Sequence, residues 1–448
     1  MDTDIIIIGA GPGGYETAVK AAKLGLQVVI IEKDKLGGTC LNSGCIPTKC
    51  LCHSAEIQDV LTSYGIQPNE EELQKAVARK DETVEKLRSG VAMLMKMPGI
   101  LYVEGEARFV DAHTVKVVSG GEEQQFTAPN IIIATGSTTK FLPIEGAYSK
   151  GVLTSTEMLN LQTLPKHLCI IGGGVIGMEF ASIFSSFGVV VDVVEFMKEI
   201  LPPFDRDIAK RLRTSLKKRG INFHVSAGAK AIHEGEPMVV DFEEKGKPQS
   251  IECDMVLMAV GRSANVGAVN LDDIGVEYTA RGIKVDENMQ TNIPGVYAIG
   301  DVNGLCQLAH AATFQGYCAL EHITCADTSY YRDALKVIPS AVFTNPEAAM
   351  VGATEEQLSE AGTEYKVLKS FYRANGKALS MDADDGLVKL LVGSDEKILG
   401  AHILGAHASD LIHELTLLMR TGGSISDIAH TVHAHPSLSE IILVASEA

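Results

Sequence analysis

The sequence lacks any run of about 20 consecutive apolar residues, although 46% of its 448 residues are hydrophobic. A helix that crosses a membrane needs a run of that length, so we expect no membrane partner. The first residues, MDTDIIIIGAG, also lack a basic stretch ahead of the apolar segment, unlike a secretion or transit signal, and this predicts a cytoplasmic protein. The apolar content suffices for several buried cores, and the length predicts roughly three domains.

Basic residues are fewer than acidic residues. Lys and Arg total 39 against 57 Asp and Glu, which gives a formal net charge of −18. A surface of that sign repels nucleic acid and anionic lipid, so we expect neither as a partner. The same charge would suit a basic protein partner.

Cysteine is sparse, with nine residues scattered over the chain. An odd and scattered set is not the disulfide framework of a small secreted domain. The stretch GGTCLNSGCIPTKC nevertheless places Cys40 and Cys45 close together, with only four residues between them. Such a pair could form a metal site, brace the fold or act as a redox couple. Zinc sites show repeated cysteine pairs and no second pair follows here, so we expect no metal.

The remaining cysteines carry no motif. Cys50 and Cys52 are expected to be buried helix residues. The others are expected to pack as small hydrophobic side chains: Cys169, Cys253, Cys306, Cys318 and Cys325.

A dinucleotide-binding pattern opens the chain. The apolar run 4–8 is followed by GAGPGG, in which Gly9, Gly11 and Gly14 fit G-x-G-x-x-G, and a helical pattern and a second strand then end at Glu32. The first glycine makes the turn, the second lets the backbone approach a pyrophosphate, and the third lets the helix pack closely on the strand. The acid at the end of the second strand accepts hydrogen bonds from ribose hydroxyls.

The same pattern recurs at a constant offset. Gly172, Gly174, Gly177 and Glu195 each lie 163 residues after their counterparts in the first copy. Two such copies favour two bound nucleotides over glycine-rich turns without a ligand, and flavin plus nicotinamide is the natural pair. Glu195 favours NAD over NADP because its charge would repel a 2′-phosphate.

Three further segments end in turns of the kind at which α/β sheets bind ligands: NIIIATGS, GVYAIGDVNG and MVLMAVGR. The residues expected to contact the nucleotides there are Thr135, Gly136, Ser137, Asp301, Gly261 and Arg262. Helix capping is the alternative explanation for Asp301.

From about Ser329 the pattern changes to alternating segments, which predict an α+β region with an antiparallel sheet. Helices are expected at Asp410–Arg420 and from Ser426 onward. The segment EELQKAVARKDETVEKLRSGVAMLMK predicts a long amphipathic surface helix. The fold class is therefore α/β, with two Rossmann-like dinucleotide-binding domains and a C-terminal α+β domain.

Six motifs together resemble the pyridine nucleotide–disulfide oxidoreductases that carry a redox disulfide beside FAD: GAGPGG, GGTCLNSGCIPTK, ATGS, GGGVIGMEF, VYAIGD and HAHPSLSE. Two of these motifs, GGTCLNSGCIPTK and HAHPSLSE, are most similar to those of the dihydrolipoamide dehydrogenase branch. The resemblance implies FAD in the first fingerprint, NAD in the second, and a homodimer built through the C-terminal domain. It also implies a lipoyl-bearing carrier protein as partner, within a 2-oxoacid dehydrogenase or glycine-cleavage complex.

The resemblance divides the chain into four segments. These are an FAD-binding domain in two parts, 1–143 and 263–328, an NAD-binding domain, 144–262, and a dimerisation domain, 329–448.

Residue roles also follow from the resemblance. Cys45 would face the flavin, and Cys40 would exchange disulfides with dihydrolipoamide. His435 would be the general acid–base and Glu440 would orient it, with His433 as the alternative histidine. This agrees with the chemistry of thiols, because a thiolate is the nucleophile and a histidine can take its proton near neutral pH.

The resemblance also implies that five residues lie around the flavin. Lys49 would lie near its N5, Glu179 would be the carboxylate partner of that lysine, and Asp301 would bind the ribityl chain. Ala309 and His310 would lie near the flavin ring.

A Cys40–Cys45 bridge cannot form on a regular helix, since positions five apart point about 140° away from each other. Gly44 and Pro47 can supply the irregular turn that the bridge needs.

Two alternatives remain. A glutathione-type reductase of the same class would favour NADP, which Glu195 argues against. A non-enzymatic nucleotide-binding partner subunit would need neither the two thiols nor the pair His435 and Glu440.

Overall fold

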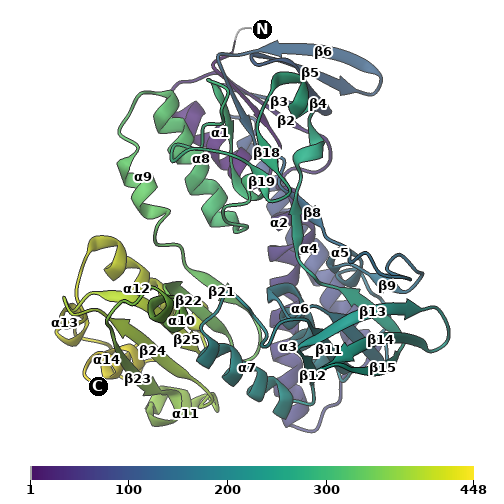
Figure 1. The fold of residues 1–448 in the computed structure, drawn as a ribbon, viewed down its shortest axis with the longest axis vertical. Helices are drawn as coiled ribbons and strands as arrows, with labels where there is room; N and C mark the ends of the chain where they lie inside the picture. Colours follow the sequence, from purple (N-terminus) through teal and green to yellow (C-terminus); the bar gives the residue numbers. More distant parts are fainter. Residues whose placement is uncertain (1–2) are drawn as a thin grey trace. The chain divides into compact units, whose positions relative to one another are not determined.

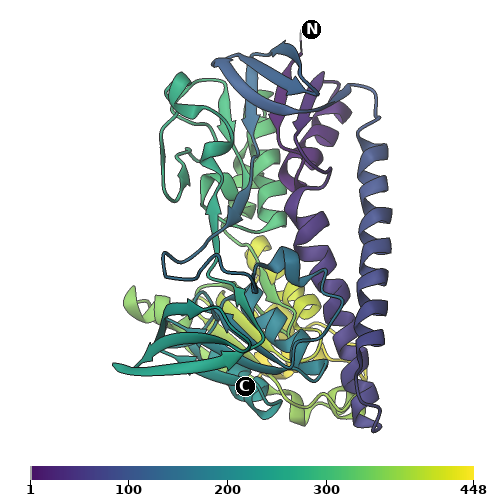
Figure 2. The same ribbon diagram turned by 90° about the vertical axis from the view of Figure 1, so that its right-hand side faces the viewer.

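The computed structural model describes residues 3–448, which divide into two compact units. The first unit contains the residues up to 50 together with 78–140 and 262–336, and the second contains 51–77, 141–261 and 337–448. Two of the unit boundaries, at 50/51 and 77/78, fall within the long helices α3 (Cys45–Ser63) and α4 (Glu70–Leu94). Figure 2 shows α4 as one uninterrupted helix, which confirms the helix expected for this segment.

The first unit is built on a five-stranded parallel sheet (Figure 1). Its strands, in order across the sheet, are β20 (Val296–Ala298), β7 (Asn130–Ile133), β1 (Ile5–Ile8), β2 (Val28–Glu32) and β3 (Ile100–Glu104). All four isoleucines of β1 are buried, as expected for a central parallel strand that is covered on both faces. The helices α1 (Pro12–Lys23) and α8 (Ala309–Ile323) pack against each other in this unit.

Smaller elements complete the first unit. They are α2 (Gly38–Ser43), the antiparallel strands β4 (Glu106–Asp111), β5 (Thr114–Ser119) and β6 (Glu122–Thr127), the pair β8 (Ser137–Thr139) and β17 (Arg262–Ala264), the pair β18 (Tyr278–Thr279) and β19 (Gly282–Ile283), the 3₁₀ turns η1 (Val266–Ala268), η2 (Leu271–Ile274) and η3 (Gly300–Asn303), and α9 (Ser329–Ala334).

The second unit contains a similar parallel sheet. Its strands, in order, are β12 (Asn222–Val225), β11 (Val190–Glu195), β10 (His167–Ile171), β16 (Met255–Met258) and β9 (Val152–Leu153). Its helices are α5 (Ser155–Met158), α6 (Val175–Ser186) and α7 (Arg206–Lys218). An antiparallel sheet of β13 (Ala227–His233), β14 (Met238–Glu244) and β15 (Lys247–Cys253) precedes β16 in the chain.

The C-terminal part of the second unit is a five-stranded antiparallel sheet, which confirms the expected α+β character. Its strands, in order, are β21 (Ser340–Val342), β22 (Ala348–Gly352), β25 (Ile398–Leu404), β24 (Leu387–Val392) and β23 (Lys366–Phe371). The accompanying elements are α10 (Glu355–Glu360), η4 (Tyr372–Ala374), α11 (Gly376–Ser380), α12 (Ala408–Thr421), α13 (Ile425–Ala429) and α14 (Glu440–Ser446).

The helix expected from Ser426 onward is wrong in its extent. Helix α13 ends at Ala429, and helical structure resumes only with α14 at Glu440. Pro436 lies between them, and a proline disfavours helical backbone at the residue before it, here His435. This non-helical segment carries both histidines of the HAHPSLSE motif, His433 and His435.

Among the helices of residues 3–448, none has both the length and the apolar character that a bilayer crossing requires.

Candidate functional site

The first nucleotide loop connects β1 to α1. Gly9 has φ +107°, and a Cβ added there would lie 2.3 Å from the carbonyl oxygen of Ala134. A Cβ on Gly14 would lie 2.0 Å from the carbonyl oxygen of Gly9, so this glycine allows the helix to approach the turn. A Cβ on Gly11 would meet no atom of the described chain within 4 Å. The outer glycines are therefore required by the fold, while the middle one borders open space.

The carboxylate of Glu32 holds this loop from the end of β2. One oxygen accepts a hydrogen bond from the backbone N–H of Ala10 at 2.8 Å, and the other accepts one from Asp34 at 2.9 Å. These bonds fix the carboxylate beside the glycine turn.

The second nucleotide loop repeats this geometry between β10 and α6. Gly172 has φ +113°, and an added Cβ would lie 2.3 Å from the carbonyl oxygen of Ala259. A Cβ on Gly177 would lie 2.0 Å from the oxygen of Gly172, whereas one on Gly174 would have no neighbour within 4 Å among residues 3–448.

Glu195 makes the same backbone contacts in the second loop as Glu32 makes in the first. It is 7% exposed and accepts hydrogen bonds from the backbone N–H groups of Gly173 at 2.5 Å and Met197 at 2.6 Å. Each of these contacts lies 163 residues after its counterpart in the first loop. The similarity thus extends from the sequence to the hydrogen bonds.

Both loops fit a dinucleotide. In each, a helix starts directly after the middle glycine, with Pro12 as the first residue of α1 and Val175 as the first residue of α6. The free N–H groups at a helix N-terminus attract the negative charge of phosphates. The space beside Gly11 and Gly174 is where a side chain would obstruct a pyrophosphate, so the residues present suit FAD and NAD.

The cysteine motif forms a break between two helices in the first unit. Helix α2, which carries Cys40, ends before Gly44, and Cys45 is the first residue of α3. Gly44 has φ −138° and ψ −113°, and a Cβ there would lie 2.9 Å from the carbonyl oxygen of Thr39. Gly44 therefore makes the irregular turn as expected. Pro47 does not contribute to it, because it lies in the first turn of α3, where its missing N–H has no helical partner to lose.

The thiols of Cys40 and Cys45 are in hydrogen-bonding contact. This contact raises the pKa of the Cys40 thiol, and burial raises it further, while the positive charge of Lys49 acts in the opposite direction. Burial lowers the pKa of Arg262, whereas the charges of Asp301 and then Cys45 raise it. Two cations, Lys49 and Arg262, therefore act electrostatically on the cysteine pair. Their charges favour a thiolate, but for Cys40 the contact with Cys45 and burial outweigh them and its pKa is raised.

Three of the predicted residues form one hydrogen-bonded group. Ser137 donates to a carboxylate oxygen of Asp301 at 2.5 Å. Arg262 donates to the hydroxyl and to the carbonyl oxygen of Ser137, both at 2.7 Å. The group forms because β8 pairs with β17 in antiparallel fashion. Arg262 thus belongs to the first unit, although its sequence context suggested the end of the second nucleotide motif.

A buried glutamine supports Asp301, and sequence reasoning gave it no such role. Gln315 is 2% exposed, and its side-chain oxygen accepts hydrogen bonds from the backbone N–H of Gly300 at 2.7 Å and from Asn303 at 2.8 Å. Asp301 lies between these residues in η3. The side chain of Asp301 accepts a hydrogen bond from Ser137, and η3 has no side-chain capping bond. The alternative that Asp301 is a helix cap is therefore not supported.

Helix α8 begins close in sequence to this turn. Its first residues are Ala309, which is half-buried, and His310, which is exposed.

Thr135 and Gly136 lie in the first unit, where Thr135 donates to the carbonyl oxygen of Asn265 at 3.1 Å and Gly136 has φ +69°.

The other predicted residues belong to the second unit. Glu179 lies on α6, is 3% exposed and accepts a hydrogen bond from the backbone N–H of Phe343 at 3.0 Å. Its burial excludes the alternative of a helix-surface acid. Gly261 has φ +103° in the turn that follows β16.

Two histidine–glutamate pairs occur near the C-terminus. Nδ1 of His435 lies 2.9 Å from Oε1 of Glu440, and the His435 side chain is 81% exposed. Nε2 of His433 lies 2.9 Å from Oε1 of Glu414, and the His433 side chain is only 5% exposed. His435 is therefore the histidine that can reach a second molecule, while His433 is held within its own chain.

The other cysteines follow the sequence expectation only in part. Cys50 and Cys52 are buried in α3 as expected, and so are Cys169, Cys253 and Cys318 within their cores. Cys325 is exposed and Cys306 is half-buried, because both lie outside the ends of regular elements. Within residues 3–448, no three His, Cys, Asp or Glu side chains are grouped so that they could hold a metal ion.

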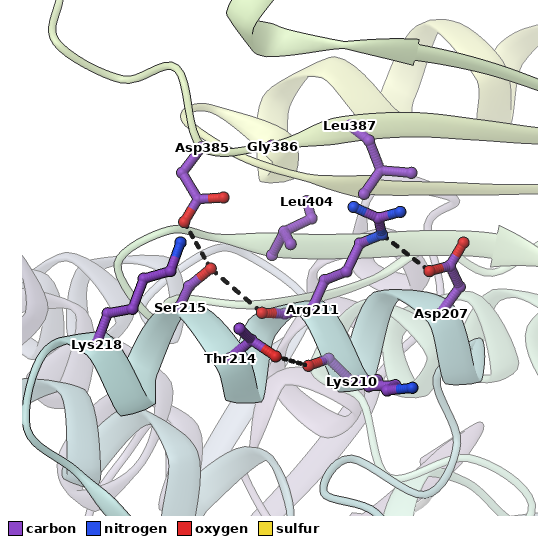
Figure 3. Close-up of a pocket in the computed structure, with 10 residues that line it drawn as sticks. All are labelled: Asp207, Lys210, Arg211, Thr214, Ser215, Lys218, Asp385, Gly386, Leu387 and Leu404. Carbon is purple, nitrogen blue, oxygen red and sulfur yellow. Dashed lines mark hydrogen bonds and ion pairs between the residues drawn. The ribbon is translucent and has the colours of Figure 1, made fainter.

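A surface pocket of about 350 Å³ lies between α7 and the strands β24 and β25 (Figure 3). Several of its polar groups bond to one another. Arg211 donates to Asp207 at 2.8 Å, and Ser215 donates to Asp385 at 2.6 Å. The pocket contains none of the residues predicted for the redox site.

Comparison with known families gives two matches. Residues 3–316 match the family described as pyridine nucleotide-disulphide oxidoreductase, and residues 338–445 match the dimerisation domain of that family.

Curated proteins match the whole chain. A dihydrolipoyl dehydrogenase from Bacillus subtilis is 41% identical over 100% of this chain and 96% of its own length. The mitochondrial dihydrolipoyl dehydrogenase from Pisum sativum is 41% identical and a leghemoglobin reductase from Glycine max is 40% identical, again over 100% of this chain and over 91% and 87% of their lengths.

Solved structures share the fold. A Cu(II) complex of the HOCl-induced flavoprotein disulfide reductase RclA from Escherichia coli is 31% identical, with a TM-score of 0.90 over 100% of this chain and 99% of that chain. LpdA from Mycobacterium tuberculosis is 26% identical, with a TM-score of 0.90 over 99% of both chains.

Proposed function

Because the chain belongs to the pyridine nucleotide–disulphide oxidoreductase family, we propose that it is a dihydrolipoyl dehydrogenase that uses FAD and NAD. It oxidises dihydrolipoamide to lipoamide and reduces NAD. The observation that carries this conclusion is the 40–41% identity to curated dihydrolipoyl dehydrogenases over the whole chain. The chain forms a homodimer through its dimerisation domain.

The proposed chemistry begins with a Cys40–Cys45 disulfide. A thiolate of dihydrolipoamide attacks the sulfur of Cys40, a new S–S bond forms to the substrate, and Cys45 leaves as a thiolate. The second substrate thiol then attacks the substrate sulfur of this mixed disulfide and releases Cys40 as a thiol. FAD, when bound, supplies the acceptor for this electron pair and the route by which it reaches NAD.

His435, supplied across the dimer, is the proposed base that takes the protons of the substrate thiols. Its exposure supports this role, and so does the carboxylate of Glu440 behind Nδ1, which would hold one tautomer and stabilise the charged ring. The electrostatic effect of Lys49 on Cys40 supports a place for this lysine beside the thiols and the flavin. Burial of Glu179 supports a specific role rather than a solvated surface charge.

FAD is proposed to occupy the loop of Gly9, Gly11 and Gly14, with Glu32 at its ribose. The part of FAD that extends beyond this loop is proposed to be lined by Ser137, Asp301, Ala309 and His310. NAD is proposed to occupy the loop of Gly172, Gly174 and Gly177.

For NAD, Glu195 would bind the ribose hydroxyls and disfavour NADP. The support is geometric. Each oxygen of the Glu195 carboxylate accepts a hydrogen bond from a backbone N–H and keeps a lone pair for a ribose hydroxyl. The proposed physiological substrate is the lipoyl group of a carrier protein in a multienzyme complex, which the enzyme meets in the cytoplasm.

The direct test is a steady-state assay of the purified flavoprotein with dihydrolipoamide and NAD. We expect NADH formation that depends on both substrates, with little activity when NADP replaces NAD. Reduction of glutathione disulfide by NADPH, without activity toward dihydrolipoamide, would instead identify a glutathione-type reductase. A protein that neither contains nor binds FAD would identify a non-enzymatic partner subunit.

A further inference from the structure

A second pair of cysteines lies in the nucleotide-binding region of the second unit. Cys169 is in the middle of the central strand β10, and Cys253 is the last residue of β15. Cys169 is 0% exposed and Cys253 is 1% exposed, and both belong to the same hydrophobic cluster. Because they are far apart in the sequence and neither belongs to a cysteine motif, the sequence does not indicate their proximity.

Backbone pairing places the segments that carry the two cysteines side by side, with Cys169 itself opposite Val256 in the register of β10 and β16. The N–H of Asp254, next to Cys253, donates a hydrogen bond to the carbonyl oxygen of His167 at 2.9 Å. One residue further along each strand, Leu168 of β10 is paired with Met255 of β16. Cys169 and Cys253 therefore extend from backbone segments that are bonded to each other.

Their thiols are in contact. The hydrogen bond between them raises the pKa of Cys169 and lowers that of Cys253. The direction of these two shifts favours Cys253 as the sulfur that ionises first. Cys40 and Cys45 are also in thiol-to-thiol contact, but in the first unit.

A polar cluster restrains the strands around this second pair. The carboxylate of Asp192, on β11, lies 2.6 Å from Nε2 of His167 and 2.9 Å from Nε2 of His224. These contacts join β10, β11 and β12, so they hold the strand that carries Cys169 on its β11 side, while β16 pairs with its other edge. A disulfide is favoured where the backbone already holds two sulfurs within reach and little movement is needed.

We propose that Cys169 and Cys253 form a second, reversible disulfide when the enzyme meets a small uncharged oxidant such as hydrogen peroxide. The thiolate of Cys253 attacks the peroxide, an S–O bond forms as the O–O bond breaks, and water leaves with one proton from the thiols. The sulfur of Cys169 then attacks the sulfenic acid, the S–S bond forms as the S–O bond breaks, and a second water leaves. Two thiols thus lose two electrons and two protons, and one peroxide becomes two waters.

This disulfide would stabilise the region that carries the second nucleotide loop. Cys169 lies three residues before Gly172, and the bridge would join β10 covalently to the end of β15. A bridge between residues distant in sequence restricts the unfolded chain, so we expect the thermal midpoint to rise by several degrees on oxidation. A dithiol reductant would reverse the change.

The test is differential thiol labelling of the native holoenzyme, before and after treatment with hydrogen peroxide and removal of the excess. Thiols are first blocked with iodoacetamide in denaturant, and disulfides are then reduced and labelled with N-ethylmaleimide before peptide mapping. We expect Cys169 and Cys253 to carry the first label before oxidation and the second label after it. A peptide pair joined through these two cysteines is expected in the unreduced digest.

Cys318 provides the matched control, because it is also 0% exposed and its thiol contacts the carbonyl oxygen of Glu287 at 3.6 Å rather than a cysteine. It should keep the first label in both samples. In the Cys253→Val variant, Cys169 should keep the first label after oxidation. The proposal is overturned if oxidised wild-type enzyme carries the first label, or a sulfinic acid, at Cys169 and Cys253.

Discussion

Nδ1 of His435 lies 2.9 Å from Oε1 of Glu440, whose other oxygen accepts a hydrogen bond from the backbone N–H of Ser437 at 2.7 Å. The bond from Ser437 and that from His435 both lower the pKa of Glu440. The carboxylate therefore keeps its charge down to a pH below the ordinary value for glutamate, and it loses the contact only as the pH falls through this lowered pKa.

The first prediction concerns this pair. His435→Gln should lower kcat for dihydrolipoamide oxidation by about 100-fold or more, because it removes the proposed base. Glu440→Gln should lower kcat less and alter its pH profile, since the imidazole remains but loses the charge behind it. Glu414→Gln is the control, because it changes the corresponding contact of His433. Equal losses in the Glu414 and Glu440 variants would contradict the assignment.

The second prediction separates two glycines of the NAD loop. Gly174→Ala adds a methyl group where the described chain has no atom within 4 Å, so the variant should fold and keep its flavin. It should raise KM for NAD, because the methyl group obstructs the approach of the pyrophosphate. Gly177→Ala places the methyl group 2.0 Å from the oxygen of Gly172 and should instead destabilise the fold. Steady-state kinetics and thermal denaturation distinguish the two effects, and an unchanged KM in Gly174→Ala would argue against NAD at this loop.

The third prediction concerns coenzyme choice. Glu195→Gln removes the negative charge and preserves the size of the side chain, so it should weaken discrimination against NADP by roughly 10-fold. The measurement is the ratio of kcat/KM for NAD to that for NADP. Glu32→Gln, the equivalent change in the first loop, should weaken FAD retention and leave this ratio alone. A shift in coenzyme preference caused by Glu32→Gln rather than Glu195→Gln would reverse the assignment of the two loops.

Both nucleotide loops could be predicted from the sequence alone, because their backbone conformation requires glycine at fixed positions and so produces a regular spacing of glycines. The positive φ of Gly9 and Gly172 and the close approach of Gly14 and Gly177 are those requirements. The carboxylate Glu195 was predictable for the same reason, since it follows its own strand at a fixed offset.

Contacts between distant segments were not predictable in this way. Arg262 and Ser137 are 125 residues apart and meet only because β8 pairs with β17, which no local pattern indicates. Cys169 and Cys253 were expected only to pack as small hydrophobic side chains, because neither belongs to a motif that indicates which residue lies beside it. The helix break before His435, in contrast, had a local signal in Pro436.

The fourth prediction concerns stability. Lys389 is 1% exposed and its ammonium lies 2.8 Å from Asp205, which is 0% exposed, and 2.5 Å from Glu355. Lys389→Met leaves Asp205 buried without its counter-charge and should lower the free energy of unfolding by about 3–5 kcal/mol. Lys369→Met removes a partly exposed partner of Asp207 and should cost about 1 kcal/mol or less. Urea denaturation measures both, and equal costs would contradict the role assigned to burial.

The fifth prediction concerns pH. The hydrogen bond with Asp192 raises the pKa of His224, and the contact with Glu244 adds to this. The stabilisation from charged His224 is therefore complete below the ordinary histidine pKa and is lost as the pH rises through the raised value. The thermal midpoint of His224→Asn should fall further below that of the wild type at about pH 6 than at about pH 9. His233→Asn, which removes a more exposed partner of Asp241, should show a smaller pH dependence. A deficit of the His224 variant that is constant with pH would contradict this account.

The central claim is that electrons from dihydrolipoamide enter the protein through Cys40 and Cys45. Its most direct test is thiol trapping of the oxidised holoenzyme, without oxygen, before and after addition of one equivalent of dihydrolipoamide and without NAD. We predict that Cys40 and Cys45 resist alkylation before the addition and that Cys40, the proposed exchange thiol, becomes alkylated after it. Unchanged labelling of Cys40 and Cys45 in a protein that still reduces NAD with dihydrolipoamide would contradict the claim.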